Sequence, residues 1–293
     1  MKAPSATVIV LLLILTQKSS FAQRSASPFL DPWKAITQFT IDTWDADRGL
    51  PQNSVNSILQ TRDGYLWLAT QEGVVRFDGV RFQVFDRSNT PQLKSNYIWI
   101  LYEDSKQNLW IGTNGGGLTK YASGRFTTYA TTDGLAGNII KTIVEDAHGN
   151  IWCGTTTGLS KIAGATISSF TTAQGLESNN ISALFVDQAN NLWIGYLNAS
   201  IGIYTKGVWK NLSRKTTLGA GPVSLFHRDR AGNMWVGSGN SGLYKISVRP
   251  NGDIEYLRDT TITTQPAIGI LSLYEDNAGA LWIGTAGNGL LRM

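Results

Sequence analysis

Short apolar segments alternate with polar, glycine-rich turns along most of the chain from residue 38 onward. Residues 108–121, NLWIGTNGGGLTKY, show this clearly, because an apolar stretch containing Trp110 enters a run of glycines and a second apolar stretch follows. A glycine-rich loop after a strand holds a phosphate where it opens a helix. These glycines lead into another strand instead, so the pattern predicts a strand, a turn and a second strand.

The same pattern recurs five more times, at residues 64–77, 150–162, 191–204, 233–246 and 280–293. Each copy is anchored by a tryptophan, and the six are Trp67, Trp110, Trp152, Trp193, Trp235 and Trp282. Subtracting successive positions gives spacings of 43, 42, 41, 42 and 47 residues. A period of this length is typical of the blades of a β-propeller.

An apolar stretch before each tryptophan ends in a short polar turn, as in ILYEDSKQN and TIVEDAHGN. Five of these turns begin with an aspartate, whereas the first has Thr61 at this position; the five are Asp104, Asp146, Asp187, Asp229 and Asp276. An aspartate here can accept backbone N–H groups farther along the turn. The acidic segments therefore predict hairpin turns between two strands.

A third and a fourth apolar stretch follow each tryptophan strand, as in GLTKY and FTTYA. The predicted fold is therefore all-β, a β-propeller of four-stranded antiparallel blades with six visible repeats. A β-sandwich is the competing all-β fold, but it does not explain equivalent turns at a fixed period. In such a meander, the loop after the second strand and the connection to the next blade lie on one rim, and the acidic turns lie on the opposite face.

These features resemble the two-component regulator propeller family, whose blades combine a G-L-x-x-N-x-(I/V) start, a D-x-x-G-N-L-W-I-G-T centre and a G-L-x-x-(F/Y) end. The first blade, DADRGLPQNSVNSILQTRDGYLWLATQEGVVRFDGVRFQVF at residues 45–85, is the best match, and the resemblance extends over residues 38–293. It implies the extracytoplasmic ligand-sensing region of a bacterial sensor, such as a hybrid histidine kinase or a diguanylate cyclase. It also implies that the parent receptor spans the inner membrane and is dimeric.

Members of this family usually continue into more blades, a β-sandwich module, a transmembrane helix and an output domain, whereas this sequence ends at Met293, after the third strand of a blade. Two interpretations fit. The sequence is the front part of a longer sensor, which we favour, or a strand around residues 39–44 supplies the missing fourth strand and closes a six-bladed ring.

The first residues have the features of a secretory signal peptide. Lys2 precedes an apolar run at residues 6–15, and Ser20 and Ala22 place small residues before a cleavage point after Ala22. The run is short for a membrane span. We therefore predict a signal peptide at 1–22, a linker at 23–37, a propeller at 38–293, and export to the periplasm.

Charge and cysteine content add little about partners. Removing Lys2 and Lys18 lowers the formal charge from +4 to +2, and no basic stripe suggests nucleic acid binding. The single cysteine, Cys153, lies in an apolar run and is expected to be a buried, inert thiol.

The sequence offers no catalytic motif, no metal-binding motif and no cofactor-binding motif. His148 and His227 lie beside the acidic turns and do not share metal-ligand spacing. The repeated aspartates could suggest calcium, but each turn usually has one carboxylate and a calcium loop needs several oxygen ligands. We therefore expect this chain to have no catalytic residue. A histidine kinase or diguanylate cyclase activity of the parent receptor would belong to a separate domain.

The six repeated tryptophans are expected to pack between blades rather than to bind a ligand. Better candidates for ligand contact lie on the predicted rim or break the repeat, and they are Gln71, Glu72, Trp99, Asn114, Tyr196 and Asn198. The favoured function is a sensor propeller that binds an extracellular ligand such as an oligosaccharide. The alternatives are a secreted propeller enzyme, such as a lyase or a glycosidase, and a scaffold propeller that binds proteins on its rim.

Overall fold

The computed structural model describes residues 43–212, 218–219, 221–248, 254–260 and 268–293. The predicted signal peptide and linker, at 1–22 and 23–37, lie outside these residues. Apart from short 3-10 turns at Ala46–Arg48, Thr131–Asp133 and Thr172–Gln174, the described secondary structure consists of strands. None of the helices in the described part has the length and apolar character required to cross a bilayer.

The strands form successive antiparallel meanders, which confirms the predicted blades. The first blade is β1 (Val55–Gln60), β2 (Leu66–Thr70), β3 (Gly73–Phe77) and β4 (Phe82–Phe85), and the second is β5 (Ile98–Glu103), β6 (Leu109–Thr113), β7 (Leu118–Ala122) and β8 (Arg125–Tyr129). The third is β9 (Ile140–Glu145), β10 (Ile151–Thr155), β11 (Leu159–Ala163) and β12 (Thr166–Phe170).

The later blades follow the same order. The fourth is β13 (Ile181–Val186), β14 (Leu192–Tyr196), β15 (Ile201–Thr205) and β16 (Val208–Asn211), and the fifth is β17 (Val223–Arg228), β18 (Met234–Ser238), β19 (Gly242–Val248) and β20 (Ile254–Arg258). The sixth has three strands among the described residues, β21 (Ile270–Glu275), β22 (Leu281–Thr285) and β23 (Leu290–Arg292).

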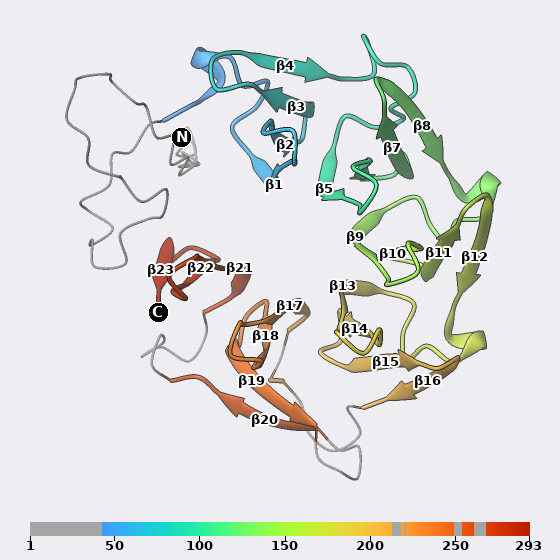
Figure 1. Ribbon diagram of the computed structural model, residues 1–293, viewed down its shortest axis with the longest axis vertical. Helices are drawn as coiled ribbons and strands as arrows, with labels where there is room; N and C mark the ends of the chain where they lie inside the picture. The colour runs from blue at the N-terminus through green and yellow to red at the C-terminus, as the bar shows by residue number, and fades with distance from the viewer. Residues whose placement is uncertain (1–42, 213–217, 220, 249–253, 261–267) are drawn as a thin grey trace, which may run out of the picture.

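The six sheets are arranged around a central axis as a β-propeller (Figure 1). The first strand of each blade faces the axis, and the fourth strand, where it is described, lies on the outside. Contacts link the innermost strands in the order β1, β5, β9, β13, β17 and β21. The chain therefore places the start of every innermost strand around one end of a central channel.

The proposed closure by residues 39–44 is only partly within the described chain. Thr43 and Trp44 are not in a strand. Trp44 packs instead against Phe77 of the first blade, with ring centroids 5.8 Å apart. Closure of the ring by an N-terminal strand therefore stays a prediction.

Five of the six repeated tryptophans pack between blades, as predicted. Five of them share a buried cluster with first-strand residues of the following blade; these are Trp67, Trp110, Trp152, Trp193 and Trp235. Trp282 is also buried. Because a lone blade would leave these indoles in water, the inter-blade contacts supply much of the apolar burial that holds the ring together.

The acidic turns lie at the ends of the innermost strands opposite the connections between blades, as predicted. Asp104 accepts the backbone N–H groups of Lys106 and Asn108, at 2.9 and 2.8 Å. The sequence did not show a second role of these aspartates: each also accepts the indole N–H of its own tryptophan, at 2.8 or 2.9 Å, in Asp104–Trp110, Asp146–Trp152, Asp187–Trp193, Asp229–Trp235 and Asp276–Trp282.

Candidate functional site

The start of every innermost strand carries a β-bulge that faces the channel end on the rim side. In each blade the pairing register with the second strand shifts at the second residue of the first strand, and these residues are Asn56, Trp99, Lys141, Ser182, Ser224 and Leu271. A bulge disrupts the ladder locally and re-aims a side chain. We call these six positions the bulge ring.

Two small polar members of the bulge ring have a structural role. The Asn56 side-chain amide donates to the carbonyl of Ile98 in the next blade at 2.8 Å, and the Ser182 hydroxyl donates to the carbonyl of Val223 in the next blade at 2.7 Å. These bonds satisfy carbonyls at the exposed edge of the neighbouring innermost strand. Two of the six positions therefore join neighbouring blades, whereas the Ser224 hydroxyl is buried without a partner among the described residues and Leu271 has no polar side-chain atom.

Trp99 and Lys141 depart from that role and contact each other. The Lys141 ammonium lies 3.6 Å from the centroid of the Trp99 ring, which is the geometry of a cation–π interaction. Tyr97, two residues earlier, also contacts this indole, with its ring centroid 4.9 Å from that of Trp99. The rim end of the channel thus combines two aromatic rings and a cation.

Both Trp99 and Lys141 are incompletely solvated. The indole nitrogen of Trp99 is buried and has no hydrogen-bond partner among the described residues. Burial lowers the pKa of Lys141 below its ordinary value, because a charged ammonium loses water there. A buried donor without an acceptor is uncommon in folded proteins and marks a place where an acceptor from a ligand would be stabilising.

Asn114, a candidate from the sequence, lies next to this cluster. Its backbone N–H donates to the carbonyl of Tyr97 at 2.8 Å, and it forms an isolated antiparallel bridge with Ile139, two residues before Lys141. The Asn114 carbonyl accepts the hydroxyl of Ser95 at 2.9 Å. The Asn114 backbone therefore lies beside Tyr97 and next to the start of the strand that carries Lys141. We call Tyr97, Trp99, Asn114 and Lys141 the rim cluster.

Tyr196 does not have the exposure that a ligand contact requires. Only 1% of its surface is accessible, and its hydroxyl accepts the backbone N–H of Glu177 at 3.3 Å. Burial raises its pKa to about 12. The ring occupies space beside Gly202, whose counterparts in the second and third blades are Thr119 and Ser160. Tyr196 breaks the repeat because it fills the core in a different way, and its buried ring is not accessible to a ligand on the rim.

The remaining candidates lie on the same rim but in other blades. Asn198 is exposed, and its side-chain oxygen accepts the hydroxyl of Ser200 at 2.6 Å, which fixes the loop after β14. Gln71 is half-buried and Glu72 is exposed in the loop between β2 and β3. The structure does not bring these three residues into the rim cluster.

Lys141 and Tyr97 were missed by the sequence analysis, although a signal for Lys141 is present. The members of the bulge ring are separated by 43, 42, 41, 42 and 47 residues, by subtraction, which are the same spacings as those of the tryptophans. Aligning the starts of the blades would therefore have shown a lysine where other blades have Asn56 or Ser182. Its contact with Trp99 could not be read from that alignment.

The histidines lie away from the rim cluster. His148 is on an acidic turn, where Nδ1 lies 3.1 Å from the side-chain nitrogen of Asn190. His227 is on β17, and burial lowers its pKa, although Glu275 and Asp229 oppose that shift. Within the described ranges there is no group of three or more His, Cys, Asp or Glu side chains that could hold a metal ion. Cys153 is buried and its pKa is raised to about 12, which agrees with an inert thiol.

Comparison with known proteins defines the class and then the family. The chain has the fold of propeller proteins, and the profile described as "Two component regulator propeller" matches residues 49–72, 92–115, 134–157, 175–198 and 264–287. The chain therefore belongs to the two-component regulator propeller family. The matched windows contain every repeat except the one centred on Trp235.

Solved structures with a similar fold have diverse functions. Virginiamycin B lyase from Staphylococcus aureus is 16% identical, with a TM-score of 0.64, covering 83% of this chain and 86% of the lyase. PorZ from Porphyromonas gingivalis, a surface component of the type-IX secretion system, is 17% identical, with a TM-score of 0.63, covering 87% of this chain and 42% of PorZ. These identities show a shared fold alone.

A third match is the extracellular domain of a hybrid two-component system from B. thetaiotaomicron, which is 18% identical with a TM-score of 0.40. The match covers 88% of this chain and 47% of that domain, so the chain spans about half of its length. No curated protein matches the sequence significantly.

Proposed function

We propose that this chain is the ligand-binding propeller of an exported bacterial signalling receptor, and that the ligand binds at the rim cluster. Membership of the two-component regulator propeller family supports the sensor role. The apolar run at residues 6–15 and the small residues Ser20 and Ala22 support export to the periplasm. The output domain of the receptor would lie outside this sequence, and the propeller itself would be non-catalytic.

The observation that carries the position of the site is the contact between Trp99 and Lys141 at the channel end. Elsewhere in the bulge ring, Asn56 and Ser182 bond to the next blade. The rim cluster instead offers aromatic surface, an ammonium donor and the unpartnered indole N–H of Trp99. Aromatic faces with nearby hydrogen-bond donors suit a sugar ring, which has both C–H faces and hydroxyl oxygens. We therefore propose an oligosaccharide as the ligand.

Signalling would follow from differential affinity. A ligand that contacts both Trp99 and Lys141 would bridge the second and third blades. It would favour the receptor conformation in which β5 and β9 lie at the distance that allows both contacts. The ligand would stabilise the propeller in proportion to its occupancy. Conformational coupling to an output domain would then require contacts made by the parent receptor.

A thermal-shift screen of neutral and acidic oligosaccharides on the full chain tests this proposal. We expect at least one to raise the Tm of the protein, and we expect Trp99→Ala and Lys141→Gln to remove most of that shift. Lys106→Gln, at an exposed lysine in the acidic turn between β5 and β6, serves as the matched control and should retain it. The rim site is wrong if a ligand is found whose shift is unchanged by Trp99→Ala and Lys141→Gln, and the oligosaccharide proposal is wrong if no member of the panel produces a shift.

A further inference from the structure

The last residue of the innermost strand links neighbouring blades on the acidic-turn face. Glu103, at the end of β5, accepts the backbone N–H of Arg62 at 3.1 and 3.2 Å. Glu145, at the end of β9, accepts the backbone N–H and the hydroxyl of Ser105 at 2.7 and 2.6 Å. Glu275, at the end of β21, accepts the backbone N–H of Arg230 at 2.8 Å. These carboxylates form a repeated link between blades.

The link between the third and fourth blades lacks this carboxylate, as does the link between the fourth and fifth, where Arg228 ends β17. Val186 ends β13 at the position of these glutamates and cannot accept a hydrogen bond. The backbone N–H of Ala147 donates instead to the side chain of Asn190 at 2.8 Å, from within the next turn. Asn190 also contacts His148. The hydrogen-bonded connection between the blades is thus kept. The smaller Val186 side chain, however, leaves unfilled part of the space that a glutamate would occupy.

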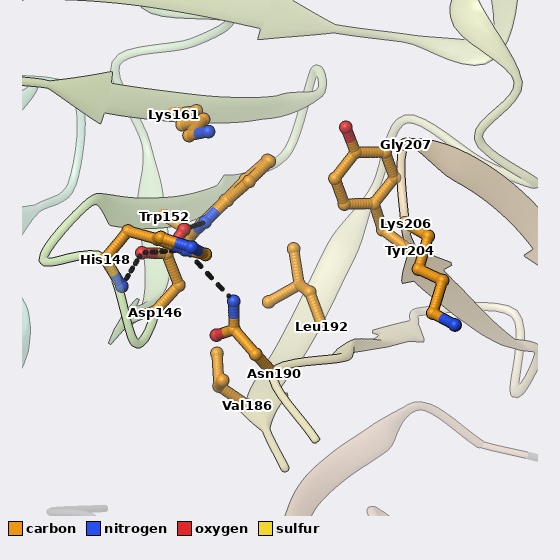
Figure 2. Close-up of a pocket in the computed structure, with 10 residues that line it drawn as sticks. All are labelled: Asp146, His148, Trp152, Lys161, Val186, Asn190, Leu192, Tyr204, Lys206 and Gly207. Carbon is orange, nitrogen blue, oxygen red and sulfur yellow. Dashed lines mark hydrogen bonds and ion pairs between the residues drawn. The ribbon is translucent and has the colours of Figure 1, made fainter. Parts of the chain in front are cut away.

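A cavity of about 170 Å³ lies at this place (Figure 2). Trp152, Val186, Leu192 and Tyr204 supply its apolar walls. The Trp152 and Tyr204 rings lie 5.6 Å apart between centroids and are inclined by 56°. A cavity of roughly 150 Å³ accommodates one benzene molecule, so this volume suits a single planar ring.

The polar groups around the cavity favour a negative charge. Lys161 and Lys206 line it, and neither lysine forms an ion pair with any residue that the structure describes. Lys161 lies 5.1 Å from the centroid of the Trp152 ring. Figure 2 shows the two lysines on opposite sides of the apolar walls.

Asp146 is the one carboxylate among the lining residues, and its oxygens are already occupied. It accepts the backbone N–H of His148 at 3.0 Å, the side-chain amide of Asn150 at 2.9 Å and the indole N–H of Trp152 at 2.8 Å. Two lysines and one hydrogen-bonded carboxylate therefore line the cavity, which leaves an excess of positive charge for a ligand.

From this arrangement we propose that the cavity between the third and fourth blades binds a small aromatic carboxylate. The ring lies against Trp152 and Tyr204, and the carboxylate faces Lys161, so the ligand supplies the negative charge that Val186 removed from the repeat. This site lies on the acidic-turn face, and the proposal does not depend on ligand binding at the rim cluster.

Benzoate binding to the full chain, measured by saturation-transfer NMR and calorimetry, tests the proposal. We expect benzoate to bind, and the neutral isostere benzamide to bind at least tenfold more weakly, because it lacks the charge that Lys161 recognises. Lys161→Gln should weaken benzoate binding about tenfold. Val186→Glu should abolish it, because the new side chain fills the cavity and repels the anion.

Two controls separate this site from other surfaces. Lys120→Gln removes the equivalent lysine of the second blade, which lies 5.5 Å from the Trp110 ring, and should leave benzoate affinity unchanged. Lys141→Gln, in the rim cluster, should also leave it unchanged. The proposal is overturned if the wild-type chain does not bind benzoate, if benzamide binds equally well, or if Lys161→Gln binds benzoate as tightly as the wild type.

Discussion

The indole nitrogen of Trp110 donates a hydrogen bond of 2.8 Å to the carboxylate of Asp104, six residues earlier in the chain. The same carboxylate caps the turn between β5 and β6 by accepting the backbone N–H groups of Lys106 and Asn108. One aspartate therefore fixes both the hairpin turn and the orientation of the tryptophan that packs on the next blade. This double role explains why aspartate and tryptophan recur together in the repeat.

Asp104→Ala should lower the free energy of unfolding by about 1 to 3 kcal/mol, because it leaves the buried indole N–H and two turn N–H groups without their acceptor. The measurement is equilibrium urea denaturation. Glu72→Ala, at an exposed side chain on the rim, is the control and should change stability by less than about 0.5 kcal/mol.

A double-mutant cycle isolates the bond to the tryptophan. Trp110→Phe removes the indole donor, so Asp104→Ala should cost less in that background than in the wild type. Equal costs in both backgrounds would show that the aspartate acts on the turn alone.

The stability of the protein should fall below about pH 4. Burial raises the pKa of Asp104, but the hydrogen bonds from Asn108 and Trp110 outweigh it, and the net pKa is lowered; the same balance lowers the pKa of Asp146. A lowered pKa in the folded state means that the unfolded chain binds protons first. This stabilisation is therefore complete above the unfolded pKa of about 4 and is lost as the pH falls through the folded value.

Thermal unfolding between pH 7 and pH 3 measures this effect. We expect Tm to be nearly constant down to about pH 4 and then to decrease, and Asp104→Asn to make the decrease less steep because it removes one titrating group. A Tm that does not change between pH 5 and pH 3 would contradict the assignment.

The fold could be predicted because its signals are periodic. Six tryptophan strands and five acidic turns recur with spacings of 41 to 47 residues, and only stacked blades make equivalent turns necessary at such a period. The packing of Trp110 between blades followed from its place inside an apolar strand. The hydrogen bond between Trp110 and Asp104 could not be predicted in this way. The turn already explained the aspartate, and packing already explained the tryptophan.

The candidate site was less predictable. Tyr196 breaks the repeat in the sequence, yet the paired change to Gly202 makes room for its ring in the core. Trp99 was found because it is an aromatic residue near the start of a blade. Its neighbour Lys141 belongs to the next blade. Their contact depends on the β-bulges at both positions, which the sequence pattern does not reveal.

Glu145→Val copies Val186 into the link between the second and third blades. It should lower the free energy of unfolding by about 1 kcal/mol, because Ser105 loses an acceptor for its N–H and its hydroxyl at a partly solvated position. Glu145→Gln keeps an acceptor and should cost less. Urea denaturation of the two variants decides this, and a Glu145→Val protein as stable as wild type would mean that the link contributes no stability.

The glycine within the tryptophan strand, Gly112 of β6, gives the most specific packing prediction. A Cβ added at Gly112 would lie 2.5 Å from Cγ2 of Ile100 and 2.9 Å from Cγ2 of Ile140 in the next blade. The first blade has Ala69 at this position, and its cross-strand partner is the small Ser57 rather than an isoleucine. At Gly112 the space is therefore limited both by the cross-strand partner Ile100 and by Ile140 of the next blade.

Gly112→Ala should destabilise the protein by about 1 to 3 kcal/mol, because the neighbouring side chains must move in a closely packed interface. Shortening the partner with Ile100→Ala should remove the nearer clash, so the double variant should be more stable than the sum of the two single changes predicts. Urea denaturation of the single and double variants measures this coupling. Additive costs would show that Ile100 does not limit the space at Gly112, and that the close approach of Ile140 from the next blade alone requires a glycine there.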